Sequence, residues 1–173
     1  MFVSWQLARP NLAVRVALVG VMGAATAGMF ASLGRDGPPQ VQARATEELD
    51  IHEAVLRYQF QHNASSQRSS AQVYCLTVLG TDPDETLLRR FARHPVPVRM
   101  ASACRVGDRV VDATTGALGL ALHVEQVEWV SSNEVTVHGG YYEASLSASR
   151  NVYRLRKQGN HWTVVADRLI LIS

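Results

Sequence analysis

The stretch that decides the fold is residues 118–172, LGLALHVEQVEWVSSNEVTVHGGYYEASLSASRNVYRLRKQGNHWTVVADRLILI. Apolar and polar residues alternate along it, as they do in strands that bury one face and expose the other. Turn-forming residues interrupt the alternation at 131–133 (SSN) and at 158–160 (QGN). The pattern therefore predicts an antiparallel sheet of consecutive strands joined by tight turns.

Two irregularities occur inside this stretch. The apolar residues occupy even positions up to Val124 and odd positions from Val127, so the buried face changes by one residue. We expect a β-bulge at 125–126, because one extra residue restores the inward face. The glycine pair at 139–140 predicts a bend in a strongly curved sheet, and the alternation over 142–148 predicts that this strand continues beyond it.

The elements that precede residue 118 include both helices and strands. Residues 46–63 repeat their apolar positions with a helical period, and Thr46 followed by two glutamates predicts the N-terminus of that helix. Short β-rich runs predict strands at about 72–79 and 98–106. Helices followed by a run of strands indicate an α+β fold, with N-terminal helices packed against a curved antiparallel sheet.

A second, short helix is predicted between those two strands. Asp82, Pro83 and Glu85 have the spacing of an N-cap, a first helical residue and the glutamate of a capping box. Several arginines follow, among them Arg90, and basic residues near a helix C-terminus commonly face solvent. We therefore interpret them as a solvated face.

The N-terminal residues 1–34 have the features of a signal peptide or an N-terminal membrane anchor. An uncharged run of about 19 residues over 16–34 is long enough to cross a bilayer, and small residues dilute it, as in a cleavable signal. Residues 35–45 read as a linker and 46–173 as a single domain. Either alternative places this domain outside the cytoplasm, periplasmic or secreted; an uncleaved run 16–34 would hold it to the membrane.

The cysteine count and the charge balance indicate the redox compartment of the domain and the partners it is expected to bind. Cys75 and Cys104 are the only two cysteines, and an even count in an exported domain predicts a disulfide between them. One alternative is a pair of buried thiols that act as small hydrophobic residues. The other is a reactive nucleophile, although neither cysteine has a neighbouring histidine or helix N-terminus in sequence to lower its pKa. Excluding Arg9 and Arg15, 15 of the 17 basic residues remain against 15 acidic ones, so nucleic acid is not an expected partner.

The order of elements resembles the cystatin-like cone of the nuclear-transport-factor-2-like superfamily. The resemblance covers about residues 46–172 and depends on that order, on GGYY at 139–142 and on the closing hairpin GNHWTV at 159–164. It implies a sheet curled around a helix, with a pocket at the open end that serves as an enzyme site, a binding site or a dimerisation surface. The family has no universal catalytic set.

Candidate site residues lie beside the glycine pair, where a bent strand would border the mouth of the cone. His138, Tyr141, Tyr142 and Glu143 are the pocket candidates. His123 and Glu125, with His138 on the next strand, have the chemistry for a metal or for acid–base catalysis, but they lie opposite the apolar face and are interpreted as a solvent-exposed pair. No contiguous motif indicates a cofactor or a metal.

These features predict a non-catalytic binding module, exported or tethered to the membrane, whose concave sheet binds a small molecule or a protein partner. One alternative is a small pocket enzyme, an isomerase, dehydratase or hydrolase, that uses His138, Tyr142 and Glu143. A second alternative is a structural subunit of an envelope assembly. The expected partners are a small molecule, an envelope protein or a second copy of the chain in a homodimer.

Overall fold

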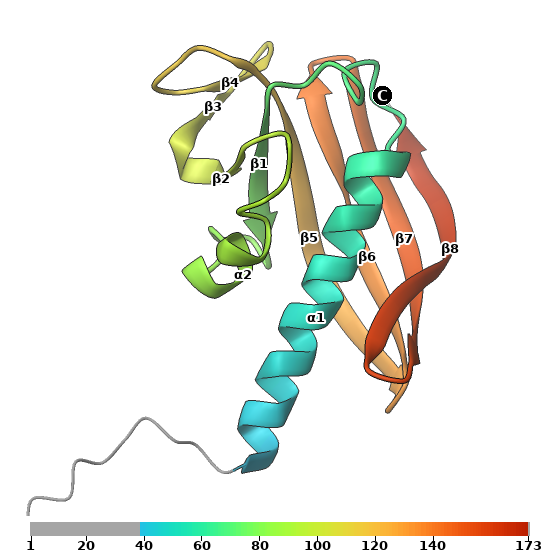
Figure 1. Ribbon diagram of the computed structural model, residues 1–173. Coiled ribbons are helices and arrows are strands. Elements are labelled where there is room, and N and C mark those ends of the chain that lie inside the picture. The colour runs from blue at the N-terminus through green and yellow to red at the C-terminus, as the bar shows by residue number, and fades with distance from the viewer. Residues whose placement is uncertain (1–38, 173) are drawn as a thin grey trace, which may run out of the picture. The chain divides into compact units, whose positions relative to one another are not determined.

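A long helix lies across one face of a broad sheet in the computed structural model, which describes residues 39–172 (Figure 1). The expected leader, residues 1–34, lies outside this described part. Within it, no helix is long and apolar enough to cross a membrane. The elements in chain order are α1 (Pro39–His62), β1 (Val73–Val78), α2 (Glu85–Arg90), β2 (Val98–Met100), a 3-10 turn (Ala101–Ala103), β3 (Cys104–Val106), β4 (Val110–Asp112), β5 (Leu118–Ser131), β6 (Glu134–Ala144), β7 (Ser147–Gln158) and β8 (His161–Ile172).

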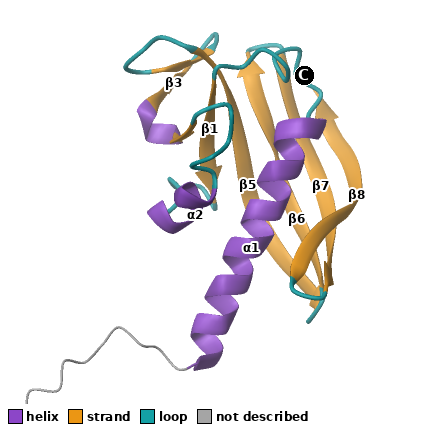
Figure 2. Cartoon of the chain, in the orientation of Figure 1, coloured by secondary structure: helices purple, strands orange, loops and turns teal. Residues whose placement is uncertain are grey.

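The sheet is mixed, so the expectation of a purely antiparallel sheet is wrong. Its strand order is β2-β1-β5-β6-β7-β8, and the β3–β4 hairpin joins it through β4 and β5. Strand β1 runs parallel to both β2 and β5, whereas β5 to β8 form the predicted antiparallel series (Figure 2). The parallel pairing is possible because α2 and three short strands form a long crossover between β1 and β5. The α+β class is confirmed; the curling of the sheet into a cone is not.

The core lies between α1 and the long strands. Helix α1 contributes one buried face, and β5 to β8 contribute alternate residues that are buried against it. The predicted bulge is present: the register of β5 against β6 shifts between Val124 and Gln126, after which Val127 and Trp129 face the helix. The fully buried members of the core include Ile51, Val55, Leu56, Leu76, Leu120, Leu122, Val124, Val135, Val137 and Leu155.

The glycine pair has a role that the sequence did not indicate. Strand β6 runs through both residues without interruption. A Cβ at Gly139 would lie 2.3 Å from the backbone oxygen of His123, and a Cβ at Gly140 would lie 1.9 Å from that of Ser149. The glycines therefore allow neighbouring strands to approach β6 closely. The chain then turns at 145–146, so the strand predicted over 142–148 is a hairpin and not one strand.

Two predicted boundaries also need correction. Helix α1 begins at Pro39 and not at Thr46, so residues 39–45 of the expected linker are helical, and the Thr46 hydroxyl donates to the Gln42 carbonyl inside the helix. Proline at a first helical position, followed by good helix formers, explains the earlier start. The predicted strand over 98–106 is divided into β2 and β3 by the 3-10 turn.

Candidate functional site

The four pocket candidates on β6 lie on two faces of the sheet. Tyr141 is buried in the core beneath α1, and Glu143 is buried beside the loop that follows α1. Tyr142 packs on the opposite face near Cys75, and His138 is partly exposed there. Neighbouring residues of a strand point to opposite faces, so His138, Tyr142 and Glu143 do not line one site.

Glu143 is a buried anchor for the loop after α1. Its Oε2 accepts from the Ser65 hydroxyl at 2.6 Å, from the Ser66 backbone N–H at 3.1 Å and from the Ser147 hydroxyl at 2.8 Å. Its Oε1 accepts from the Ser66 hydroxyl at 2.6 Å. Burial alone would raise the pKa of Glu143, but the serine donors outweigh it and hold the pKa below its usual value. The carboxylate is therefore ionised, and both of its oxygens accept hydrogen bonds from serines. Glu143 thus has a structural role.

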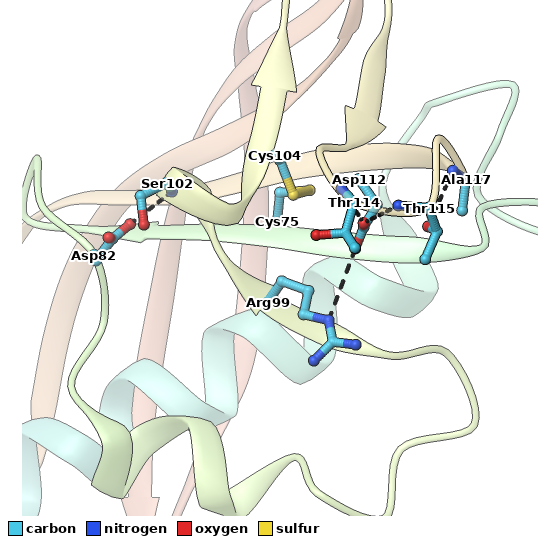
Figure 3. The surroundings of a disulfide bond; sticks show 9 residues. All are labelled: Cys75, Asp82, Arg99, Ser102, Cys104, Asp112, Thr114, Thr115 and Ala117. Carbon is cyan, nitrogen blue, oxygen red and sulfur yellow. Dashed lines mark hydrogen bonds and ion pairs between the residues drawn. A yellow bond between two sulfur atoms is a disulfide. The ribbon is translucent and has the colours of Figure 1, made fainter.

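The predicted disulfide between Cys75 and Cys104 is present (Figure 3). It links β1 to β3 on the face of the sheet away from α1, inside a small apolar cluster that Tyr142 joins. The Tyr142 hydroxyl donates to the Gly107 carbonyl at 2.7 Å. Tyr142 therefore holds the β3–β4 hairpin to the sheet.

The two histidines on that same face use different carboxylates. His123 Nε2 lies 3.5 Å from Glu125 Oε1, and Arg150 donates to the same oxygen at 2.9 Å. His138 Nε2 lies 4.0 Å from Glu128 Oε1. Within residues 39–172, no group of three or more histidine, cysteine or acidic side chains is placed to hold a metal ion.

A cavity that the sequence did not indicate lies between α1, the end of β1 and the start of α2. Its volume is about 340 Å³, near the lower limit of small-ligand pockets. We call it the His52 pocket. Its polar lining comes from Glu48, His52, Thr81, Asp82 and Asp84, and its apolar lining comes from Ala45, Leu49, Val78, Leu79, Pro83 and Leu87.

His52 is the unusual residue of this pocket. Only 6% of it is exposed, and its Nε2 has no hydrogen-bond partner among the described residues. Burial lowers the pKa of His52 below its usual value, although the nearby carboxylates of Glu48 and Asp84 act in the opposite direction. At neutral pH this is therefore an uncharged imidazole, and its unpaired Nε2 is itself closed off from solvent.

The acidic residues at the pocket entrance also hold the local backbone. The N-cap of α2 is Asp84 and not Asp82: Asp84 Oδ1 accepts from the Leu87 N–H at 2.7 Å. Asp82 Oδ1 accepts from the Ser102 N–H at 3.0 Å, as Figure 3 shows. Hydrogen bonds from Ser102 lower the pKa of Asp82. Asp84 has a second carboxylate oxygen that can accept from a ligand.

An ion-pair network fixes α2 against α1 beside the pocket. Arg90 of α2 donates to Asp50 at 2.5 Å and to Glu53 at 2.9 Å, both on α1. Arg57 of α1 in turn donates to the Arg90 carbonyl at 2.8 Å. The interpretation of the α2 arginines as a solvated face is therefore wrong for Arg90, which is only partly exposed.

Leu79 adds a conformational peculiarity at the rim of the same pocket. Its φ is +52°, in the left-handed region that a non-glycine residue rarely adopts, and more than half of its surface is exposed. A tight turn fixes it, because Val78 and Thr81 exchange backbone hydrogen bonds of 2.8 and 3.1 Å on either side. Strained, exposed backbone of this kind commonly lies at functional sites.

The edge strand β8 carries the most continuous exposed apolar surface of the described chain. Leu169, Ile170, Leu171 and Ile172 are each about half exposed. The register against β7 shifts twice, which leaves Val165 and Ile170 as extra residues. Bulges on an edge strand hinder pairing with another edge. The expected homodimer stays a prediction.

Comparisons of the chain with protein-family models, curated proteins and solved structures return no match. The resemblance to the nuclear-transport-factor-2-like superfamily therefore stays a prediction.

Proposed function

We propose that the chain is an extracytoplasmic binding module, exported or held at the membrane by its N-terminal segment, that takes a small molecule into the His52 pocket. The observation that carries the proposal is the cavity of about 340 Å³ between α1, β1 and α2, with the almost fully buried His52 in its lining. Glu48, Thr81, Asp82 and Asp84 place polar groups beside an apolar wall, a combination typical of small-molecule sites.

The compartment is supported by the disulfide between Cys75 and Cys104. Disulfides persist in oxidising compartments such as the periplasm and the extracellular space. This agrees with an N-terminal run of export type at 16–34. The binding site of the proposal lies at the junction of α1, β1 and α2, and not on the concave sheet that the sequence predicted.

A binding role suits the site better than catalysis. The pocket-enzyme alternative requires His138, Tyr142 and Glu143 to act together, but they lie on two faces of the sheet. Glu143 is, in addition, engaged by three serines. The alternative of a structural subunit in an envelope assembly stays a prediction that co-purification from membranes would test.

Methyl NMR on the full chain tests the proposal. n-Hexylamine, hexan-1-ol and hexanoate, three probes of one length and different charge, are titrated while the leucine signals are followed. We expect at least one probe to shift Leu49, Leu79 and Leu87, which line the pocket. Ala45→Phe should abolish the shifts because it fills the cavity, whereas Ala43→Phe adds the same bulk to an exposed position of α1 outside it. Equal behaviour of both variants, or no shift with any probe, would contradict the proposal.

A further inference from the structure

His52 differs from the other five histidines of the chain in how its imidazole is held. It is only 6% exposed, and its Nε2 is closed off from solvent without a hydrogen-bond partner among residues 39–172. His161 lies at an exposed position. The remaining four each have a ring nitrogen beside a backbone carbonyl or a glutamate oxygen: His62, His94, His123 and His138.

The surroundings of His52 accommodate only the neutral imidazole. A neutral imidazole has one N–H and one acceptor nitrogen, whereas an imidazolium carries an N–H on both nitrogens. Whichever tautomer is present at neutral pH, the charged form would therefore place an N–H at the closed-off Nε2, where no acceptor is available. A buried charge without a hydrogen-bonded partner is strongly disfavoured, so a proton bound by His52 requires the side chain to leave its site.

The charged groups nearest to His52 are carboxylates. Glu48 on α1 and Asp84 at the start of α2 act on it electrostatically, and Asp82 lines the same cavity. Arg44 pairs with Glu48 at 3.7 Å, and both side chains are about half exposed. Burial outweighs the two carboxylates and keeps the pKa of His52 below its usual value. An imidazolium that moves towards this cavity leaves its buried site and meets negative charge.

No other charge from the neighbouring elements competes with this movement. Strand β1 and the turn at 79–81 contain no charged residue. The last arginines of α2 are paired elsewhere, Arg89 with Glu85 and Arg90 with two acidic residues of α1. Within residues 39–172, no lysine or arginine lines the cavity.

His52 lies where α1 meets the end of β1 and the start of α2. Displacement of its ring therefore removes a packed side chain from the contact of three elements. We propose that His52 is an acid-sensitive switch: the neutral imidazole closes this junction, and the protonated imidazole opens it. The switch goes beyond the proposed binding function, because it acts on the fold whether or not the pocket takes a ligand.

The sign and the pH range follow from linkage. The folded protein binds a proton at His52 less readily than the unfolded chain, so this contribution to stability is complete well above pH 6.5 and decreases as the pH falls below it. With an unfolded pKa of about 6.5, the unfolding equilibrium constant can rise by at most about tenfold between about pH 7.5 and about pH 5.5. This interval lies above the range in which carboxyl groups usually titrate.

Urea unfolding of the full chain at these two pH values tests the switch. His52→Leu removes the titrating group and keeps a side chain of similar size. We expect the unfolding equilibrium constant of the original chain to rise about three- to tenfold more than that of His52→Leu. His161→Leu is the matched control, since the same substitution at an exposed position should keep the full response. A response that is equal in the original chain and His52→Leu would overturn the proposal.

Hydrogen exchange on the unaltered chain supplies a test that needs no variant. The Leu79 N–H donates to the Val124 carbonyl at 2.7 Å beside the junction, whereas Val137 lies fully buried in β6. We expect the protection factor of the Leu79 amide to be lower than that of Val137 and to fall at least about threefold from about pH 7.5 to about pH 5.5. An unchanged protection factor at Leu79, or one equal to that of Val137 at both pH values, would overturn a local switch. Neither result bears on whether the pocket binds a small molecule.

Discussion

Replacement of Glu143 by glutamine measures how much a buried, ionised carboxylate stabilises this fold. The variant keeps the shape of the side chain but removes its charge and turns one acceptor oxygen into an NH₂ donor. The arrangement that preserves most of the existing contacts puts the NH₂ towards the Ser66 hydroxyl, which can accept instead of donating. The other oxygen then keeps the bonds from Ser65, Ser147 and the Ser66 N–H as neutral ones.

The expected cost follows from those three bonds. A hydrogen bond to a charged group contributes about 1.5–3 kcal/mol and a neutral one about half as much, so three bonds that lose their charge cost about 2–4.5 kcal/mol. Urea unfolding followed by circular dichroism at pH 7 measures this difference. Glu128→Gln on the neighbouring strand is the matched control, because that side chain is about half exposed, and we expect a change within about 0.5 kcal/mol.

The pH dependence supplies an independent check on the same variant. The pKa of Glu143 is lower in the folded protein than its usual value, so its contribution is present above the unfolded pKa of about 4.3 and is lost as the pH falls through the folded pKa. The gap in stability between the original chain and Glu143→Gln should therefore shrink towards about pH 3. A gap below about 0.5 kcal/mol at pH 7, or a gap that is unchanged at low pH, would refute the reasoning.

Three further perturbations test contacts that hold the fold together. Reduction, or serine at both Cys75 and Cys104, opens a loop with a sequence separation of 29 and should cost about 3.5 kcal/mol in denaturant unfolding on the chain-entropy model; an unchanged midpoint would contradict it. Gly140→Ala should lower the thermal midpoint sharply, because its Cβ would meet a backbone oxygen of β7 at 1.9 Å, whereas Gly107→Ala meets nothing within 4 Å and should be near neutral. Arg90→Ala should cost about 1–2 kcal/mol, reduced by its partial exposure, and a cost that survives high salt unchanged would argue against an ionic origin.

Local sequence rules were sufficient for the antiparallel part of the sheet. The alternation from residue 118, the turns near 131–133 and 158–160 and the bulge after Val124 all depend on neighbours along the chain. The parallel pairing of β1 depends on residues about 45 positions apart, such as Tyr74 and Leu120. No local period records such a partner, so an antiparallel sheet was the expectation.

The sequence itself could have shown that the candidate residues on β6 do not share one pocket. Tyr142 and Glu143 are adjacent, and adjacent strand residues face opposite sides of a sheet. Once β6 was predicted as a strand, His138, Tyr142 and Glu143 could not share one pocket. The close approach at the glycine pair was missed for a different reason, because it shows only in the distance from Gly140 to β7.

The His52 pocket could not be predicted because its chemistry depends on which aspartate caps α2. Asp82 and Asp84 both precede glutamate-containing helical sequence, and the sequence alone favoured Asp82. With Asp84 as the cap and Asp82 bonded to Ser102, both carboxylates stand at the pocket entrance while each holds backbone in place. Removing either would disturb the fold together with the charge. Glu48, by contrast, lines the same pocket from α1 and forms an exposed pair with Arg44.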